Sequence, residues 1–344
     1  MTRVVVALAL LCVAFAPAAA RACAGCSNPN LPGARALDAG AGRGRLDLGA
    51  GLVATTMRVV HAEACPEIGP ICAARDEPPQ LHDQRFYSAE LRLFGALGLT
   101  ESLGVEVQVP LRLLSTDITF RRLDGQAFTP DYENIHHRDE TLVGLGDPWV
   151  LARGATRLGA ARLEARGGIG LPLGDTQPNP FERARRGLSH QHIQFGAGSV
   201  SGVLALDARQ PAGPVDVTAS GQAVLFFAES RFGYQPGDRV SGGVAVGGRP
   251  TPRLRLEGGV DTLIEQPERW DGAIEEEGNL GRWELLVGGR VAYAFDALTL
   301  ALSIKAPVYV HLTEAGDHDH GGSAGQLEYP AVVALTIARG LQVL

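Results

Sequence analysis

Alternation of apolar and polar residues over unusually long segments is the feature that most constrains this chain. Between 103 and 113 every odd position is aliphatic, whereas the even positions include Arg112. Between 298 and 310 every even position is apolar, whereas Lys305 and His311 occupy odd positions. Successive strand side chains point to opposite faces, so each segment has one apolar and one polar face. A tilted strand needs about 9–11 residues to cross hydrocarbon, and both segments are long enough.

The same pattern recurs along the whole chain. The predicted strands are 44–59, 84–97, 102–118, 142–157, 160–173, 191–207, 215–229, 239–249, 252–264, 282–295, 297–311 and 328–343. Short connections lie near 98–101, 158–159, 209–214, 249–251 and Asp296, and they alternate with long ones near 61–83, 119–141, 174–190, 230–238, 265–281 and 312–327. The fold prediction is therefore an all-β, closed antiparallel transmembrane β-barrel of about 12 strands, with short periplasmic turns and long extracellular loops, in the bacterial outer membrane.

A soluble β-sandwich or propeller is the alternative, because alternation alone does not say which face points inward. The polar face carries charges such as Arg162, Glu164 and Arg255, and burying these unpaired in a sandwich core costs several kcal/mol each, on the order of a whole domain's stability. A hydrated lumen accommodates them. The net charge of −7 and the pI near 5.7 argue against nucleic acid as a partner.

Barrels of this kind carry aromatic girdles at the two membrane interfaces. Aromatic residues make up only 6% of this chain, so the girdles are expected to be thin. Their candidate residues are Tyr87, Trp149, Trp270, Trp283, Tyr293, Phe295 and Tyr329.

Three regions are predicted along the chain. Residues 1–22 read as a signal peptide with Arg3, an apolar stretch and small residues before a cut after Ala20 or Ala22. The second cut would make Cys23 the first residue and raises lipidation, for which Arg21 is a poor match. Residues 23–42 form a periplasmic N-terminal segment with the Pro/Gly-rich composition of a plug, and 43–344 form the transmembrane β-barrel.

Four cysteines remain after signal cleavage, an even number in an oxidising compartment, and disulfides are the default interpretation. The spacing of Cys23 and Cys26 also suits a metal-ligand pair or a redox dithiol. Cys65 and Cys72 lie in the first long loop, on the other side of the predicted barrel wall. The preferred pairings are therefore Cys23 with Cys26 and Cys65 with Cys72.

Three glycine-rich motifs suggest a family. They are Gly144-Leu145-Gly146-Asp147-Pro148, the strand Gly168-Ile169-Gly170-Leu171-Pro172-Leu173-Gly174-Asp175, and Phe195-Gly196-Ala197-Gly198-Ser199. In these motifs the chain resembles the outer-membrane β-barrel family named for the MetA pathway of phenol degradation, whose members are often called putative transporters. The specific part of the resemblance covers about 60 residues, and the strand pattern covers nearly all of the mature chain. The resemblance implies an outer-membrane location and channel activity, without catalytic residues.

The last long loop offers imidazole and carboxylate ligands that suit zinc, copper or nickel. The candidate metal ligands are His311, Asp317, His318, Asp319 and His320. His136 and His137 in the second long loop, and His190 and His192 after the third, add ligands only if those loops converge. The alternative is a hydrated polar loop without metal, and no other cofactor is predicted.

Charged residues on the polar faces are expected to line the lumen. The predicted lumen residues are Glu90, Arg92, Glu106, Arg112, Asp147, Arg153, Arg162, Glu164, Arg166, Glu257, Arg290 and Lys305. Ladders of opposite charges either fill a small barrel structurally or line a selective pore.

The predicted function is an outer-membrane channel or transporter for passive diffusion of small molecules, with membrane lipid and a small-molecule solute as partners. The alternatives are a metal-binding outer-membrane protein, using the His/Asp loop and the Cys23–Cys26 motif, and a non-conducting structural barrel. No enzyme is predicted, since nothing in the sequence sets a base against a nucleophile such as Ser189 or Ser230.

Overall fold

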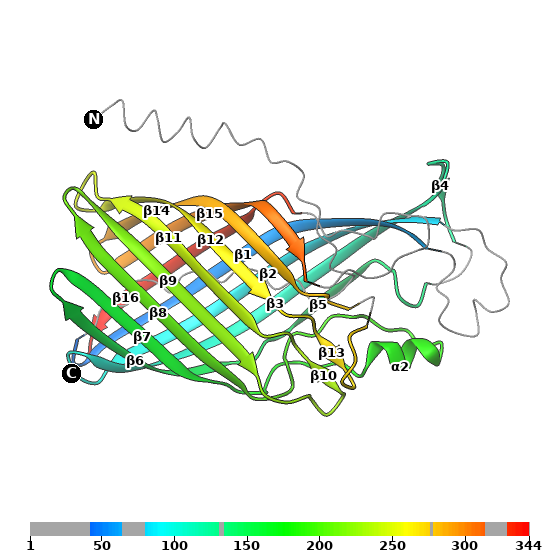
Figure 1. Cartoon of the computed structure of the whole chain (residues 1–344), viewed down its shortest axis with the longest axis horizontal. Coiled ribbons are helices and arrows are strands. Elements are labelled where there is room, and N and C mark those ends of the chain that lie inside the picture. The colour runs from blue at the N-terminus through cyan, green and yellow to red at the C-terminus, as the bar shows by residue number, and fades with distance from the viewer. Residues whose placement is uncertain (1–41, 64–79, 131–133, 276–277, 314–328, 344) are drawn as a thin grey trace.

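A single antiparallel sheet closed into a ring forms the body of the protein (Figure 1). The computed structural model describes residues 42–63, 80–130, 134–275, 278–313 and 329–343. The ring strands are β1 (Arg45–Glu63), β2 (Gln80–Gly98), β3 (Leu103–Arg122), β5 (Glu140–Leu145), β6 (Trp149–Leu158), β7 (Ala161–Gly170), β8 (Ser201–Ala212), β9 (Val215–Phe226), β11 (Arg239–Gly248), β12 (Leu254–Glu265), β14 (Arg282–Phe295), β15 (Leu298–Leu312) and β16 (Val332–Gln342). β5 and β6 share one place beside β3, so the ring has twelve strand positions. β1 pairs with both β2 and β16, which closes the ring.

The outer face of the ring is apolar, as the membrane-barrel prediction requires. On β3 the exposed fractions of Leu103, Val105 and Val107 are 58%, 41% and 44%, whereas those of Glu106 and Gln108 are 3% and 6%. The side chains that a soluble protein would bury thus cover the outside, and the polar ones face the lumen. This arrangement confirms the outer-membrane β-barrel and excludes the sandwich alternative.

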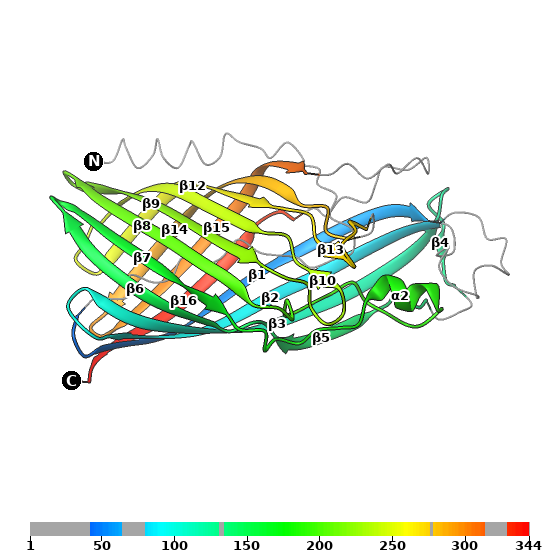
Figure 2. The same ribbon diagram turned by 60° about the horizontal axis from the view of Figure 1, so that its bottom comes forward.

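The two ends of the ring differ. Short turns and the C-terminus lie at one end, which we take as periplasmic, and the long connections lie at the other (Figure 1). β1, β2 and β3 have 19, 19 and 20 residues and run past the ends of the other strands on the long-loop side (Figure 2). That side also carries the short elements β4 (Ala127–Phe128), α2 (Pro180–Arg185), β10 (Tyr234–Gln235) and β13 (Arg269–Trp270).

Most predicted strands match the observed ones within a few residues, with two exceptions. The predicted strand 142–157 is broken into β5 and β6 at residues 146–148. The predicted strand 191–207 begins only at Ser201 in β8, so residues 191–200 were wrongly assigned. Both differences have the same physical cause, which lies inside the lumen and is described with the site below.

A β-bulge in β15 reverses the faces of its last residues. Leu286 pairs with Pro307 and Leu285 pairs with Tyr309, so Val308 is the extra residue. Tyr309 is therefore 44% exposed, and His311 is exposed as well. The expectation that His311 shares the polar face with Lys305 was wrong.

The candidate girdle residues divide into two groups. Tyr87, Trp283, Tyr293 and Phe295 are exposed on outward positions. The Trp283 and Tyr309 rings are 5.1 Å apart, and the Tyr293 and Phe295 rings are 4.6 Å apart. Trp270 and Tyr329 are buried and Trp149 lines a cavity in the lumen, so these three were wrongly placed in the girdle.

Several predictions fall outside the described residues. These are the signal peptide 1–22 and the plug segment 23–42, of which only residue 42 is described. They also include the metal ligands Asp317, His318, Asp319 and His320 and the disulfide cysteines Cys23, Cys26, Cys65 and Cys72. They remain predictions. No helix among the residues that the structure describes is long and apolar enough to cross a membrane.

Candidate functional site

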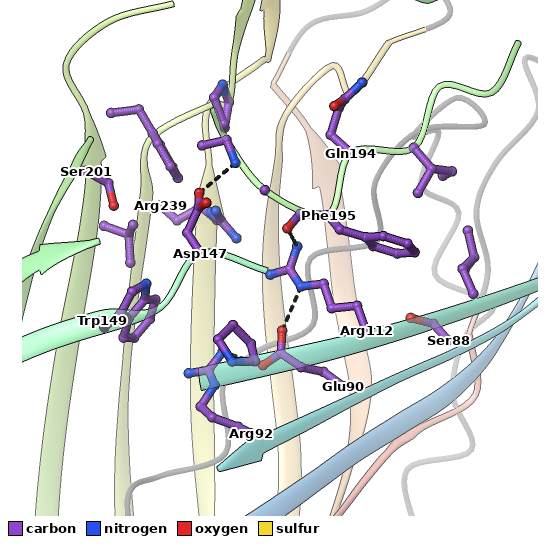
Figure 3. Close-up of a pocket in the computed structure, with 18 of the residues that line it drawn as sticks. Ser88, Glu90, Arg92, Arg112, Asp147, Trp149, Gln194, Phe195, Ser201 and Arg239 are labelled. Atoms are coloured by element: carbon purple, nitrogen blue, oxygen red, sulfur yellow. Dashed lines mark hydrogen bonds and ion pairs between the residues drawn. The ribbon is translucent and has the colours of Figure 1, made fainter. Parts of the chain in front are cut away.

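The break between β5 and β6 turns one wall residue into the lumen. On the neighbouring strand β3, Leu111 pairs with Leu145 of β5 and Gln108 pairs with Trp149 of β6. Two β3 residues therefore face three residues, Gly146-Asp147-Pro148, and the ladder is interrupted there. Pro148 lacks a backbone N–H, which makes it compatible with such an interruption. The break aims the Asp147 carboxylate inward (Figure 3).

Asp147 holds a long connection inside the barrel. Its Oδ1 accepts a hydrogen bond from the backbone N of Gly174 at 2.9 Å, and its Oδ2 accepts one from the backbone N of Ala197 at 2.6 Å. Asp175 binds the wall in return, since its Oδ2 accepts from the backbone N of Leu145 at 2.7 Å. The residues 171–200 between β7 and β8, here called the docked segment, are thereby fixed against the broken strand.

Glycines make this docking possible. A Cβ on Gly196 would lie 2.7 Å from backbone atoms of Gly174, closer than real Cβ contacts come. A Cβ on Gly144 would overlap the ring of Phe195. The three glycine-rich motifs of the sequence therefore meet at one place, and their glycines serve close contact between the wall and the docked segment.

The docked segment also completes an apolar cluster inside the barrel. Ile193 is 3% exposed and contacts inward residues of the wall strands. The other buried members are Val53, Met57, Val59, Phe86, Leu114, Leu286, Tyr329, Val332 and Ala334. The docked segment and this cluster therefore occupy part of the long-loop half of the lumen; we call it the capped half and include in it Asp147, the docked segment and this cluster.

Ion pairs fill the opposite half of the lumen, here called the charged half. Its pairs are Arg153–Glu164, Arg166–Asp207, Arg209–Asp216, Arg255–Asp216, Arg255–Glu257, Arg290–Glu257 and Lys305–Asp261, with N–O distances between 2.6 and 3.1 Å. Some pairs cross an intervening strand at a glycine. A Cβ on Gly247 of β11 would lie 2.8 Å from Arg255, which spans from β12 to Asp216 on β9.

Each predicted lumen residue makes a polar contact on the inside. Glu90 lies between Arg92 and Arg112, with 2.9 Å from Arg112 Nε to Glu90 Oε2. Arg166 also faces Glu106 at 3.9 Å, and Arg162 faces Glu164 at 3.4 Å. Asp207, Asp216 and Asp261 also form lumen ion pairs and were not predicted, although each is an acidic residue on the polar face of its strand.

Cavities lie within both halves. One cavity, of about 1230 Å³ including space open to solvent, borders the docked segment and is lined by both charged and aromatic side chains. Its lining includes Glu90, Arg112, Asp147, Trp149 and Phe195 (Figure 3). Two further cavities, of about 660 and 1110 Å³ on the same measure, share Arg290 in the charged half.

Two buried titratable groups, Glu268 and His190, lie in the connections on the long-loop side of the barrel. Glu268 is 2% exposed, and its Oε atoms accept from Tyr234 Oη and Trp270 Nε1, both at 3.3 Å. Burial raises the pKa of the Glu268 carboxyl to about 7. Burial lowers the pKa of His190, and Arg138 and Arg183 lower it further, although its hydrogen bond to Leu188 opposes this shift.

No protein-family model and no curated protein matches the chain. Among solved structures, the chain is similar to the COG4313 outer membrane channel from Pseudomonas putida F1, with a TM-score of 0.57 and 14% identity over 90% of this chain and 100% of that one. This likeness shows a shared outer-membrane barrel fold.

Looser matches include a Pseudomonas aeruginosa FadL homologue and the P. putida toluene transporter TodX. Their TM-scores are 0.37 and 0.38, with 10% and 12% identity over 87% and 86% of this chain and 90% of each of those. Superpositions this loose carry no further conclusion.

Proposed function

We propose that the barrel is a narrow outer-membrane channel for passive diffusion of small amphipathic molecules. The observation that carries this proposal is the lumen itself, where cavities with charged and aromatic walls lie between the docked segment and the short-turn mouth. A barrel serving structure alone has no need of such cavities. The Pseudomonas putida protein of the same fold is described as an outer membrane channel, which supports the proposal.

The chemistry of the lining favours solutes with both a polar and an apolar part. Arg92 stacks over Trp149 with 4.7 Å from its guanidinium carbon to the ring centroid, beside Glu90 and Arg112. Such a wall offers an aromatic face and charged groups within a few ångströms of each other. The resemblance to the MetA-pathway barrels implies channel activity without naming a solute, and membership in that family is part of this proposal.

Planar-bilayer recording of the refolded chain tests the proposal. We expect small, discrete conductance steps that fall when a small aromatic acid is added at millimolar concentration. Liposome swelling with sugars of increasing size gives an independent measure of the bore. A barrel that inserts, as shown by heat-modifiable gel mobility, and gives neither conductance nor swelling is the structural barrel of the alternative.

A further inference from the structure

Two loops that are distant in sequence bring five histidines together on the long-loop side of the barrel. His136 and His137 come from the connection between β3 and β5, whereas His190 and His192 belong to the docked segment. His82 of β2 lies beneath them, with 3.0 Å between its Nδ1 and the Nδ1 of His137. All five side chains are buried, with exposed fractions of at most 5%.

The convergence is held by backbone contacts independent of the imidazoles. The backbone N of His190 donates to Ile135 O at 2.9 Å, which ties the two loops directly. Arg138 Nη1 donates to both Ile135 O and His190 O, at 2.8 and 3.1 Å. Asn134 Oδ1 accepts from the backbone N of His136 and of His137. The histidines therefore lie on a preformed frame.

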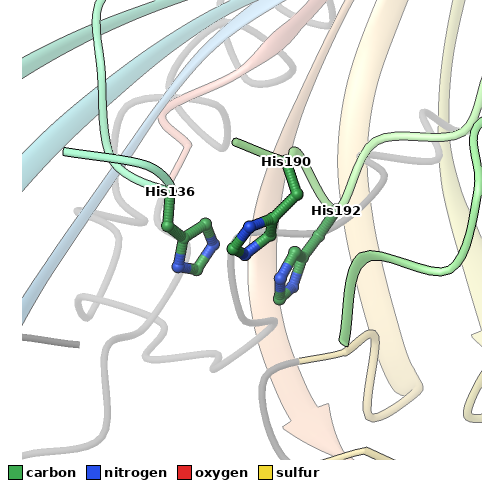
Figure 4. Close-up of side chains that lie close together, drawn as sticks. All are labelled: His136, His190 and His192. Carbon is green, nitrogen blue, oxygen red and sulfur yellow. The ribbon is translucent and has the colours of Figure 1, made fainter. Parts of the chain in front are cut away.

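Three of the rings face one another closely enough to share an ion. His136, His190 and His192 each offer a nitrogen, and these nitrogens all lie within 4.8 Å of one another (Figure 4). The His136 and His192 rings are stacked with 4.3 Å between centroids. A tetrahedral ion with Zn–N bonds of about 2.0–2.1 Å separates its ligand nitrogens by roughly 3.3 Å, so modest ring rotations bring the three nitrogens to it.

The hydrogen bonding of His190 suits a ligand. Its Nδ1 lies 2.9 Å from Leu188 O, an acceptor, so Nδ1 carries the proton and Nε2 carries the lone pair. That Nε2 is buried without a hydrogen-bond partner among the described residues. A carbonyl on the far ring nitrogen is the contact that typically orients a metal-bound histidine.

Two cations lie near the site. Arg138 Nη2 lies 2.8 Å from Glu140 Oε2, which balances its charge, and Arg183 donates from Nε and Nη2 to the carbonyl oxygen of Ser189. Glu140 also accepts from Gln191 Nε2 at 2.6 Å, between two of the histidines in the chain. On the other side His192 packs against Phe181 of α2, with 4.7 Å between ring centroids.

We propose that His136, His190 and His192 form a three-imidazole site for a divalent transition-metal ion of the Zn²⁺, Cu²⁺ or Ni²⁺ type. An all-nitrogen donor set favours these ions over Mg²⁺ or Ca²⁺, which prefer oxygen. Binding links the β3–β5 connection to the docked segment. The proposal goes beyond the channel function and is tested by binding, whether or not the barrel conducts.

Co²⁺ and Zn²⁺ titrations of the untagged, detergent-folded full chain test the site. We expect one Co²⁺ per barrel with a visible d–d absorption band, and its displacement by Zn²⁺. His136→Ala and His192→Ala should each weaken Co²⁺ binding by more than about 100-fold, beyond the 10–100-fold typical of losing an outer-shell partner. His82→Ala is the matched control, a buried histidine of the same cluster, and should change affinity less than about 3-fold.

Two further measurements keep the proposal open to refutation. A variant with His311, His318 and His320 all changed to Ala should bind as the unchanged chain does; loss of binding there, with binding retained in His192→Ala, overturns the proposal. If an Ala variant fails to fold, as judged by heat-modifiable mobility, Cu²⁺ electron paramagnetic resonance of the unchanged chain decides. Superhyperfine splitting from three nitrogens supports the site, and splitting from two or fewer overturns it.

Discussion

The two halves of the lumen are held together by different kinds of contact. In the charged half, most partners sit on adjacent strands or one strand further, as Arg153–Glu164 and Arg255–Asp216 do. In the capped half, Asp147 binds backbone groups of the docked segment, 27 and 50 residues further along the chain. The charged half thus follows from closing the ring, whereas the capped half needs a separate docking event.

The largest expected effect comes from removing the anchor of the capped half. Asp147→Ala deletes both acceptors, and two hydrogen bonds to a charged group stabilise by about 3–6 kcal/mol together. The docked segment should leave the wall while the ring stays closed. We expect single-channel conductance to rise several-fold, with unchanged β-sheet circular dichroism. An unaltered conductance would mean that the docked segment does not limit the bore.

Gly196→Ala should undock the same segment without removing a charge. Its new Cβ would lie 2.7 Å from the Gly174 backbone, which cannot move aside as a flexible side chain can. We expect a smaller conductance increase than in Asp147→Ala, and easier proteolysis within residues 171–200. Gly154→Ala is the matched control, because its Cβ would meet only Leu103 Cδ2 at 3.7 Å. Equal behaviour of the two variants would argue against close packing as the cause.

The packing around Glu268, on the long-loop side of the barrel, should become less stable as pH rises. Burial raises the pKa of Glu268 from its ordinary value of 4.5 to about 7 in the folded protein, so between these values the unfolded state binds fewer protons. The contribution of Glu268 to stability therefore falls between about pH 4.5 and pH 7, by about 3 kcal/mol. Fluorescence of the buried Trp270 should follow this change, and Glu268→Gln should flatten it. A persisting pH dependence in that variant would assign it to another group.

Asp216→Asn should produce the smallest effect and confine it to the charged half. The change leaves Arg209 and Arg255 with less compensation, although Arg255 keeps Glu257 at 2.7 Å. With a side chain already 17% exposed to lumen solvent, the cost should be about 1–3 kcal/mol, below that of a fully buried pair. The reversal potential in a KCl gradient should shift toward chloride, while proteolysis of residues 171–200 stays unchanged. A change in that proteolysis would show that the halves are coupled.

The difference between the halves also explains what could be predicted from the sequence. Period-two alternation located the ring strands, because each wall side chain meets either lipid or lumen. The same alternation misled at residues 191–200, where Ile193, Phe195 and Ala197 alternate with Gln194 and glycines. Ile193 and Ala197 are buried and Phe195 is partly buried inside the barrel, not in lipid, and alternation cannot distinguish the two environments.

The histidine cluster was only partly visible in the sequence. His136, His137, His190 and His192 were recognised as additional ligands if their loops converged, and the structure brings those loops together. The convergence depends on backbone contacts such as His190 N to Ile135 O, which leave no trace in residue types. The His/Asp loop was conspicuous because its residues are consecutive. Spatial neighbours from separate loops carry no such local signature.

The outward aromatic pairs on β14 and β15 carry a consequence for how the protein sits in its surroundings. Trp283 and Tyr293 stand ten residues apart on β14, each touching an aromatic neighbour. At about 3.4 Å per residue and a tilt of about 40°, that spacing corresponds to roughly 25 Å along the barrel axis. This distance matches the thickness of an outer-membrane hydrocarbon layer. The two aromatic pairs therefore lie at the two membrane interfaces and fix the position of the barrel along the membrane normal.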